Sequence, residues 1–117
     1  MIVDAHQHFW RLDRGDYTWL TPQLGVLYRD YLPNDLAPLH ARLGIGASVL
    51  VQAAASEAET HYLLALARRH ESIAGVVGWT DFATSDAPQH IAALVGAGGG
   101  KLKGLRPMIQ DIADPGW

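Results

Sequence analysis

The chain has 117 residues, of which 49% are hydrophobic and 18% charged, and its formal net charge is -3. Such a chain forms one globular domain at most, and its charge offers no basic surface to nucleic acid or to an anionic membrane. Because the chain contains no cysteine, disulfides and thiolate metal sites are excluded. A transition metal would therefore need histidine or carboxylate ligands.

The N-terminus has no basic segment followed by a long apolar stretch, and no apolar run is long enough to span a bilayer. We therefore expect a soluble cytoplasmic protein that acts on a small molecule, without a nucleic-acid or membrane partner.

Four short apolar runs predict β-strands at residues 2–5, 47–52, 73–79 and 102–106. Helical spacing of apolar residues predicts helices that begin at residue 34 or 35, at 56 and at 86, and that end near 43, 70 and 95. Gly44 and Gly96 are expected to stop the first and last of these helices. Ser56 and Glu59 match a capping box, in which the Glu59 side chain reaches back to the amide of Ser56.

The alternation of strands and helices predicts an α/β fold with parallel strands joined by crossover helices. Residues 10–31 form an aromatic and polar insertion after the first strand, which places them at the carboxyl ends of the strands, where such folds bind ligands. Four strand-led units without a final covering helix indicate the front half of a larger fold, either an eight-unit barrel or a doubly wound sheet, although the latter would normally end in a helix.

The most informative pattern is the histidine pair at residues 6 and 8. In a regular strand, alternate side chains point to the same face, so we expect Asp4, His6 and His8 to project together. Two converging imidazoles are typical of a metal or acid–base site, although one histidine could equally cap the strand while the other is solvated.

The polar residues at the predicted strand ends form a candidate pocket. Its members are His6, His8, Gln52, Trp79, Asp81 and Arg106.

Several of these residues have two interpretations. Arg106 could bind a substrate carboxylate or polarised oxygen, or it could form a salt bridge with Asp111. Asp81 could line the pocket, although a cap on the following loop is the favoured interpretation. Gln52 is expected to line the pocket without catalysing, and Trp79 to be a pocket wall or a core residue. The remaining histidines fall on predicted helices and receive no chemical role; they are His40, His61, His70 and His90.

Four stretches in this order resemble the amidohydrolase-2 branch of the amidohydrolase superfamily, and in particular its sugar-lactone hydrolases of the L-fuconolactonase and L-rhamnonolactonase type. These stretches are residues 2–10, 31–36, 76–81 and 103–111. The resemblance implies a (β/α)8 barrel, of which residues 1–117 would be the N-terminal half with about the first four units.

The resemblance also implies roles for three residues. His6 and His8 would take catalytic and metal-ligand positions for a divalent metal, usually zinc, and Arg106 would orient the substrate. The further ligands, and the aspartate that activates water, come from strands five to eight in this family and have no counterpart here. Some lactonases of this branch are thought to work without a metal, with the histidine pair serving the substrate.

The reaction implied is the attack of water on the carbonyl of a lactone, with a carboxylate-bearing compound as another substrate class. One alternative is a decarboxylase of the same branch. Another is a non-catalytic half-barrel whose open edges and apolar faces lead to self-association as a homo-oligomer.

Overall fold

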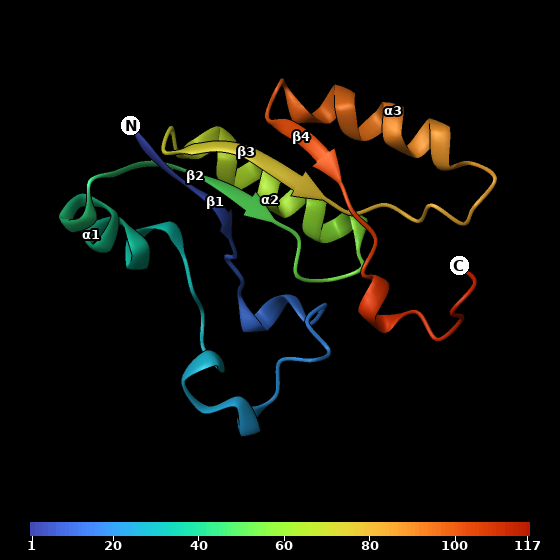
Figure 1. Cartoon of the computed structure of the whole chain (residues 1–117), viewed down its shortest axis with the longest axis horizontal. Helices are drawn as coiled ribbons and strands as arrows, with labels where there is room; N and C mark the ends of the chain where they lie inside the picture. Colours follow the sequence, from blue (N-terminus) through green and yellow to red (C-terminus); the bar gives the residue numbers. More distant parts are fainter.

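The computed structural model describes residues 1–117 and contains one parallel sheet of four strands in the order β1-β2-β3-β4 (Figure 1). The strands are β1 (Ile2–Gln7), β2 (Ile45–Val51), β3 (Ile73–Gly78) and β4 (Leu102–Leu105). The α-helices are α1 (Pro33–Leu43), α2 (Glu57–Arg69) and α3 (Ala87–Gly98). Short 3-10 turns form η1 (Leu12–Arg14), η2 (Pro22–Leu27) and η3 (Ile109–Asp111). None of the helices has the length and apolar character needed to cross a bilayer.

All predicted strands and helices are present, and two helix ends differ from expectation. Helix α1 begins at Pro33, and the Asp35 carboxylate caps it by accepting the amide hydrogen of Leu32 at 2.8 Å. Helix α3 continues through Gly96, the predicted stop, and ends before Gly99. Gly99 has φ +54° and supplies the left-handed conformation that ends a helix, so the helix ends three residues later than the sequence pattern indicated.

The main core lies between the sheet and α2. Leu50 of β2 and Val76 of β3 pack with Leu63 and Leu64 of α2, and all four are completely buried. Helix α2 approaches β3 so closely that a side chain at Gly78 would collide with Thr60. This packing fixes the first turn of α2 against the carboxyl end of the sheet.

A second core forms inside the insertion between β1 and α1, beyond the arrowhead of β1 in Figure 1. Trp10, Tyr17 and Leu20 are buried there against Ala53 and Ala54, which follow β2. Trp10 and Tyr31 close the base of the insertion by exchanging two backbone hydrogen bonds of 3.0 Å. The insertion is therefore attached to the carboxyl ends of the strands.

A bulge in β1 changes the predicted direction of one side chain. Asp4 pairs with Ser48 and Gln7 with Leu50, so the step along β1 is one residue longer than the step along β2. Asp4 turns towards α1, with its Oδ2 3.9 Å from His40 Nε2. The bulge interrupts the two-residue alternation on which the expectation of a face shared by Asp4, His6 and His8 rested.

Candidate functional site

The carboxyl ends of β1, β2 and β4 surround a cavity of about 350 Å³, which we call the His8–Arg106 pocket. Its lining residues are His8, Trp10, Trp19, Ala53, Arg106, Met108, Gln110 and Asp111. These residues come from the end of β1, the insertion, the β2–α2 loop and the segment after β4. The pocket therefore lies on the face where a parallel α/β fold binds ligands.

The two histidines of β1 and its end lie side by side. The ring centroids of His6 and His8 are 4.9 Å apart, and the ring planes are nearly perpendicular at 73°. His8 Nδ1 lies 2.8 Å from the carbonyl oxygen of Val51. Because a carbonyl can only accept, Nδ1 carries the proton and Nε2 keeps a free lone pair.

Burial lowers the pKa of His8, against the opposing effect of the hydrogen bond to Val51. The nearby His6 and Arg106 lower the pKa further by charge repulsion. The lowered pKa favours the neutral form of His8, which is the form that a ligand or general base requires.

Arg106 is held by Gln52 rather than by an acid. Its Nε donates to Gln52 Oε1 at 3.1 Å, and its Nη2 donates to the Gln52 carbonyl at 3.0 Å. Asp111 lines the same pocket, but the predicted alternative of an Arg106–Asp111 salt bridge does not form. Gln52 itself is completely buried, so in this structure it supports Arg106 instead of lining the pocket.

Trp79 and Asp81 lie in a neighbouring cavity of about 260 Å³, which we call the Trp79–Asp81 pocket. Met108 and Asp111 line both pockets and separate them. Asp81 Oδ1 accepts the amide hydrogen of Ala83 at 2.9 Å, which is the loop cap favoured from the sequence. The structure thus brings His8 and Arg106 to one pocket and puts Trp79 and Asp81 in the adjacent one. His6 lies beside His8 but lines a separate cavity of about 340 Å³ on the other side of that ring.

The aromatic wall of the His8–Arg106 pocket was not among the predicted site residues. Trp10 and Trp19 meet edge to face, with ring centroids 5.3 Å apart. Trp19 Nε1 donates to the Ala53 carbonyl at 2.7 Å, and Trp10 Nε1 donates to the Arg29 carbonyl at 2.8 Å. The sequence carries a signal for this wall, because the insertion at residues 10–31 is rich in aromatic side chains and is predicted to lie on the ligand-binding face.

The histidine pair fits part of a zinc site. Two imidazoles are suitable ligands, and the carbonyl that binds His8 Nδ1 orients the ring as second partners of zinc ligands do. No group of three or more histidine, cysteine, aspartate or glutamate side chains in the structure is arranged to hold a metal. Residues 1–117 thus bring two imidazoles together without a third metal-binding side chain beside them.

The helix histidines lie away from this pocket, as predicted. His90 Nδ1 is 2.8 Å from Glu57 Oε1, and Thr80 Oγ1 donates to the same oxygen at 2.6 Å. These contacts link α2, α3 and the end of β3.

Comparison with known proteins agrees with this architecture. The Amidohydro_2 family model, described as amidohydrolase, matches residues 3–117. Two curated proteins named L-fucono-1,5-lactonase are similar: one from Burkholderia ambifaria is 46% identical over 115 residues, and one from Burkholderia multivorans is 47% identical over 112 residues. The alignments cover 98% and 96% of this chain but 39% and 37% of those proteins.

Solved structures of amidohydrolases also match most of this chain over less than half of their own length. An amidohydrolase from Burkholderia multivorans with bound zinc is 45% identical, with a TM-score of 0.87 over 97% of this chain and 39% of that one. Amidohydrolase 2 from Bifidobacterium longum subsp. infantis is 30% identical, with a TM-score of 0.57 over 67% of this chain and 32% of that one.

The predicted fold class is confirmed, since the four parallel strands and their three helices align with the N-terminal portion of barrel-forming amidohydrolases. The chain spans about two fifths of the length of the curated relatives it matches. On the match over residues 3–117 and on these relatives, the chain belongs to the amidohydrolase family.

Proposed function

We propose that these residues form the N-terminal half of an amidohydrolase barrel and supply part of the active site of a hydrolase that opens a sugar lactone. The observation that carries the proposal is the convergence of His8 and Arg106 on one pocket at the carboxyl ends of the strands. The two similar proteins named L-fucono-1,5-lactonase support the lactone as substrate class.

In this proposal Arg106 binds the substrate. Its Nε and Nη2 are held by Gln52, which leaves Nη1 able to donate to a carbonyl or hydroxyl oxygen in the pocket. A guanidinium fixed in this way costs little reorganisation when the carbonyl oxygen gains negative charge during water attack. Trp10 and Trp19 provide an apolar wall on which the sugar ring can lie.

His6 and His8 would hold a divalent metal, with zinc the first choice because a similar amidohydrolase was solved with zinc bound. When bound, such a metal polarises the lactone carbonyl or lowers the pKa of a water molecule. The chain's own part is to keep His8 neutral and oriented, through burial and through the Val51 carbonyl. Without a metal, the free Nε2 of His8 can accept a proton or a substrate hydrogen bond.

The proposal is tested in the full gene product that carries this sequence, by following hydrolysis of L-fucono-1,5-lactone. His8→Ala is expected to lower kcat/KM by about 10²–10⁴-fold, the range for losing a group that acts in proton transfer or charge stabilisation. Arg106→Lys is expected to raise KM, because lysine cannot keep both contacts to Gln52. His61→Ala serves as the control, since His61 lies on α2 away from the pocket and should leave kcat/KM unchanged.

Two results would contradict the proposal. Full activity of His8→Ala would remove His8 from the reaction, and release of carbon dioxide from a carboxylate substrate without lactone hydrolysis would favour the decarboxylase alternative.

The 117-residue chain alone is expected to bind zinc weakly and to hydrolyse nothing measurable, because two imidazoles lack a third protein ligand. Calorimetric titration with zinc, together with the lactone assay, checks this expectation. Micromolar affinity, with turnover that His6→Ala abolishes, would contradict it. Sedimentation of the same chain tests the predicted self-association.

A further inference from the structure

The segment of residues 51–54 begins at the last residue of β2 and holds three pocket side chains through consecutive carbonyl groups. The bonds run from His8 Nδ1 to the Val51 oxygen (2.8 Å), from Arg106 Nη2 to the Gln52 oxygen (3.0 Å), and from Trp19 Nε1 to the Ala53 oxygen (2.7 Å). The directions of these carbonyls therefore set the directions of the three side chains.

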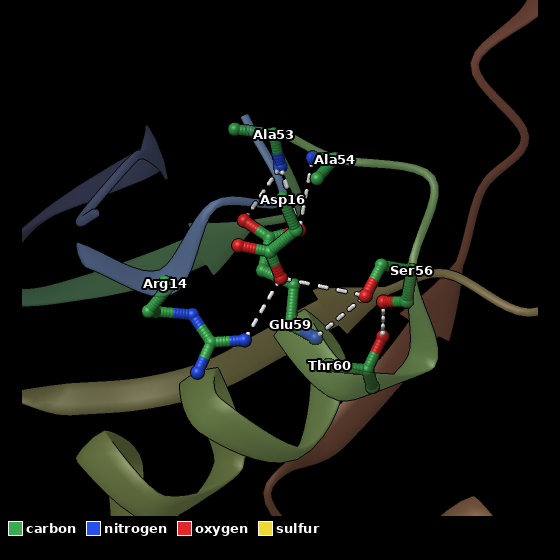
Figure 2. A network of polar contacts seen from close by, with 7 residues as sticks. All are labelled: Arg14, Asp16, Ala53, Ala54, Ser56, Glu59 and Thr60. Carbon is green, nitrogen blue, oxygen red and sulfur yellow. Dashed lines mark hydrogen bonds and ion pairs between the residues drawn. The ribbon is translucent and has the colours of Figure 1, made fainter. Parts of the chain in front are cut away.

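Glu59 binds the other side of the same segment. Both of its carboxylate oxygens accept the amide hydrogen of Ala53 at 3.0 Å, and Oε2 also accepts that of Ala54 at 3.0 Å (Figure 2). Glu59 is completely buried and lines neither of the two pockets. Its carboxylate thus satisfies two amides that would otherwise be buried without partners.

The Ser56 hydroxyl anchors Glu59 by accepting its amide hydrogen at 3.1 Å, as the capping box predicts. The other half of the motif is different from expectation, because the carboxylate reaches Ala53 and Ala54 instead of the Ser56 amide. Ser56 Oγ also donates to Asp16 Oδ2 at 3.4 Å, and Asp16 pairs with Arg14 at 2.8 Å (Figure 2). The network joins α2 to the insertion that carries the aromatic wall.

Peptide planarity connects the two sides of the segment. The amide of Ala53 and the carbonyl of Gln52 belong to one rigid plane, as do the amide of Ala54 and the carbonyl of Ala53. Each plane is bound at its amide end by Glu59. At its carbonyl end, one plane is bound by Arg106 and the other by Trp19.

The plane that holds His8 is independent of Glu59. Its carbonyl belongs to Val51, and its amide is that of Gln52, which donates to the Val77 carbonyl of β3 at 2.8 Å. Sheet pairing, rather than a side chain, fixes the orientation of this plane.

We propose that Glu59 is a positioning residue of the His8–Arg106 pocket, which aligns Arg106 and Trp19 by clamping two peptide planes of residues 52–54 and leaves His8 to the sheet. The consequence for activity rests on the proposed function, whereas the clamp itself does not. Glu59 thereby sets the orientation in which the Arg106 guanidinium and the Trp19 indole meet a substrate. Glu59 itself does not touch that substrate.

The test compares Glu59→Gln with Glu57→Gln in the full gene product. Both changes replace a carboxyl group in the first turn of α2 by an amide, but the Glu57 carboxylate binds Thr80 and His90 and not the 51–54 segment. Glutamine replaces one carboxylate oxygen by an NH2 donor. If the NH2 takes the place of Oε1, it faces the Ala53 amide donor to donor, and if it takes the place of Oε2, the Ala54 amide loses its acceptor, so the clamp is weakened in either orientation.

Nuclear magnetic resonance measures hydrogen exchange of the Trp19 indole proton and of the Arg106 Nη2 protons, which are the donors to the two clamped carbonyls. In Glu59→Gln we expect exchange about tenfold faster at one or both donors, the change expected for a weakened hydrogen bond. The shift of the His8 ring should stay as in the unchanged protein, and Glu57→Gln should alter neither donor. Unchanged exchange in Glu59→Gln, or equally faster exchange in both variants, overturns the proposal.

A kinetic experiment separates failure of the clamp from failure of the proposed function. On L-fucono-1,5-lactone, Glu59→Gln is expected to raise KM by more than it lowers kcat, because Arg106 and Trp19 bind substrate in the proposed function. A protein without lactonase activity would refute the proposed function while the exchange result still decides the clamp.

If Glu59→Gln does not fold, exchange of the Ala53 and Ala54 amides in the unchanged protein replaces the comparison. Strong protection of both amides supports the clamp, and exchange as fast as in an exposed loop overturns it.

Discussion

Two carboxylates in the first turn of α2, Glu57 and Glu59, lie in contrasting surroundings. Glu59 is completely buried and binds backbone amides, whereas the Glu57 side chain is 30% exposed and binds the side chains of Thr80 and His90. Burial raises the pKa of Glu59 to about 7, against the lowering effect of the Ala53 and Ala54 amides. The hydrogen bond from Thr80, followed by that from His90, lowers the pKa of Glu57.

The comparison shows how position within one helical turn separates two functions of the same residue type. Glu59 faces the β2–α2 loop and organises the backbone beneath the pocket, at the cost of burying a carboxyl group. Glu57 faces α3 and joins two helices near solvent. Water still hydrates its charge there, so its contacts contribute little to the stability of the fold.

The largest expected difference concerns removal of each carboxylate. Glu59→Ala should lower the free energy of unfolding by about 4 kcal/mol, because two buried amides lose their acceptor and a cavity remains. Glu57→Ala should lower it by about 1 kcal/mol, mainly through the lost partner of the buried Thr80 hydroxyl. Urea denaturation of both variants measures the difference, and equal losses would remove the distinction between the two sites.

The pH dependence of stability provides the next test. The pKa of Glu59 is raised from 4.5 to about 7 in the folded protein, so its contribution is fully present below pH 4.5 and is lost as the pH rises to about 7. The expected loss is about 3 kcal/mol, from the size of the shift. Glu57 behaves in the opposite sense: its contribution is present above pH 4.5 and is lost as the pH falls through its lowered pKa.

The measurement is the free energy of unfolding between about pH 3 and pH 8 (roughly the range over which these groups titrate) for the unchanged protein, Glu59→Gln and Glu57→Gln. The difference between the unchanged protein and Glu59→Gln should fall with rising pH. A difference that is flat over this range would mean that Glu59 ionises as it does in the unfolded chain.

The smallest effects concern the residues that anchor each carboxylate. Ser56→Ala should cost about 1 kcal/mol, the usual value for a helix cap, because Ser56 Oγ binds the Glu59 amide. His90→Ala should cost about 0.5 kcal/mol or less, since the His90 side chain is 45% exposed. Thermal unfolding ranks the two variants, and a larger loss from His90→Ala would reverse the comparison.

The sequence predicted the order and type of the regular elements because apolar periodicity is a local property. The run from Ala47 to Val51 could only be a buried strand, and the Ser56 cap placed the start of α2 within one residue. The histidine pair was identified for the same reason, since residues two apart on a strand lie on one side.

Features that depend on other parts of the chain were less predictable. The bulge between Asp4 and Gln7 arises from pairing with β2, which no local pattern encodes. The capping box predicted where α2 begins. It did not predict which amides the Glu59 carboxylate binds, because these belong to a loop positioned by tertiary packing. Gln52 was correctly placed at a strand end, but its burial beneath Arg106 depends on β4.

The aromatic insertion also has a consequence for the order in which the chain assembles. β2 and β3 pair residues such as Val49 and Gly75, joined through α2, whereas β1 and β2 pair Val3 with Ala47 across the insertion and α1. Closing the longer loop costs more chain entropy, so we expect the β2–α2–β3 unit to form in the folding nucleus and β1 to join it later. The backbone bridge between Trp10 and Tyr31 shortens that loop once it forms, and thereby speeds the arrival of the strand that carries the histidine pair.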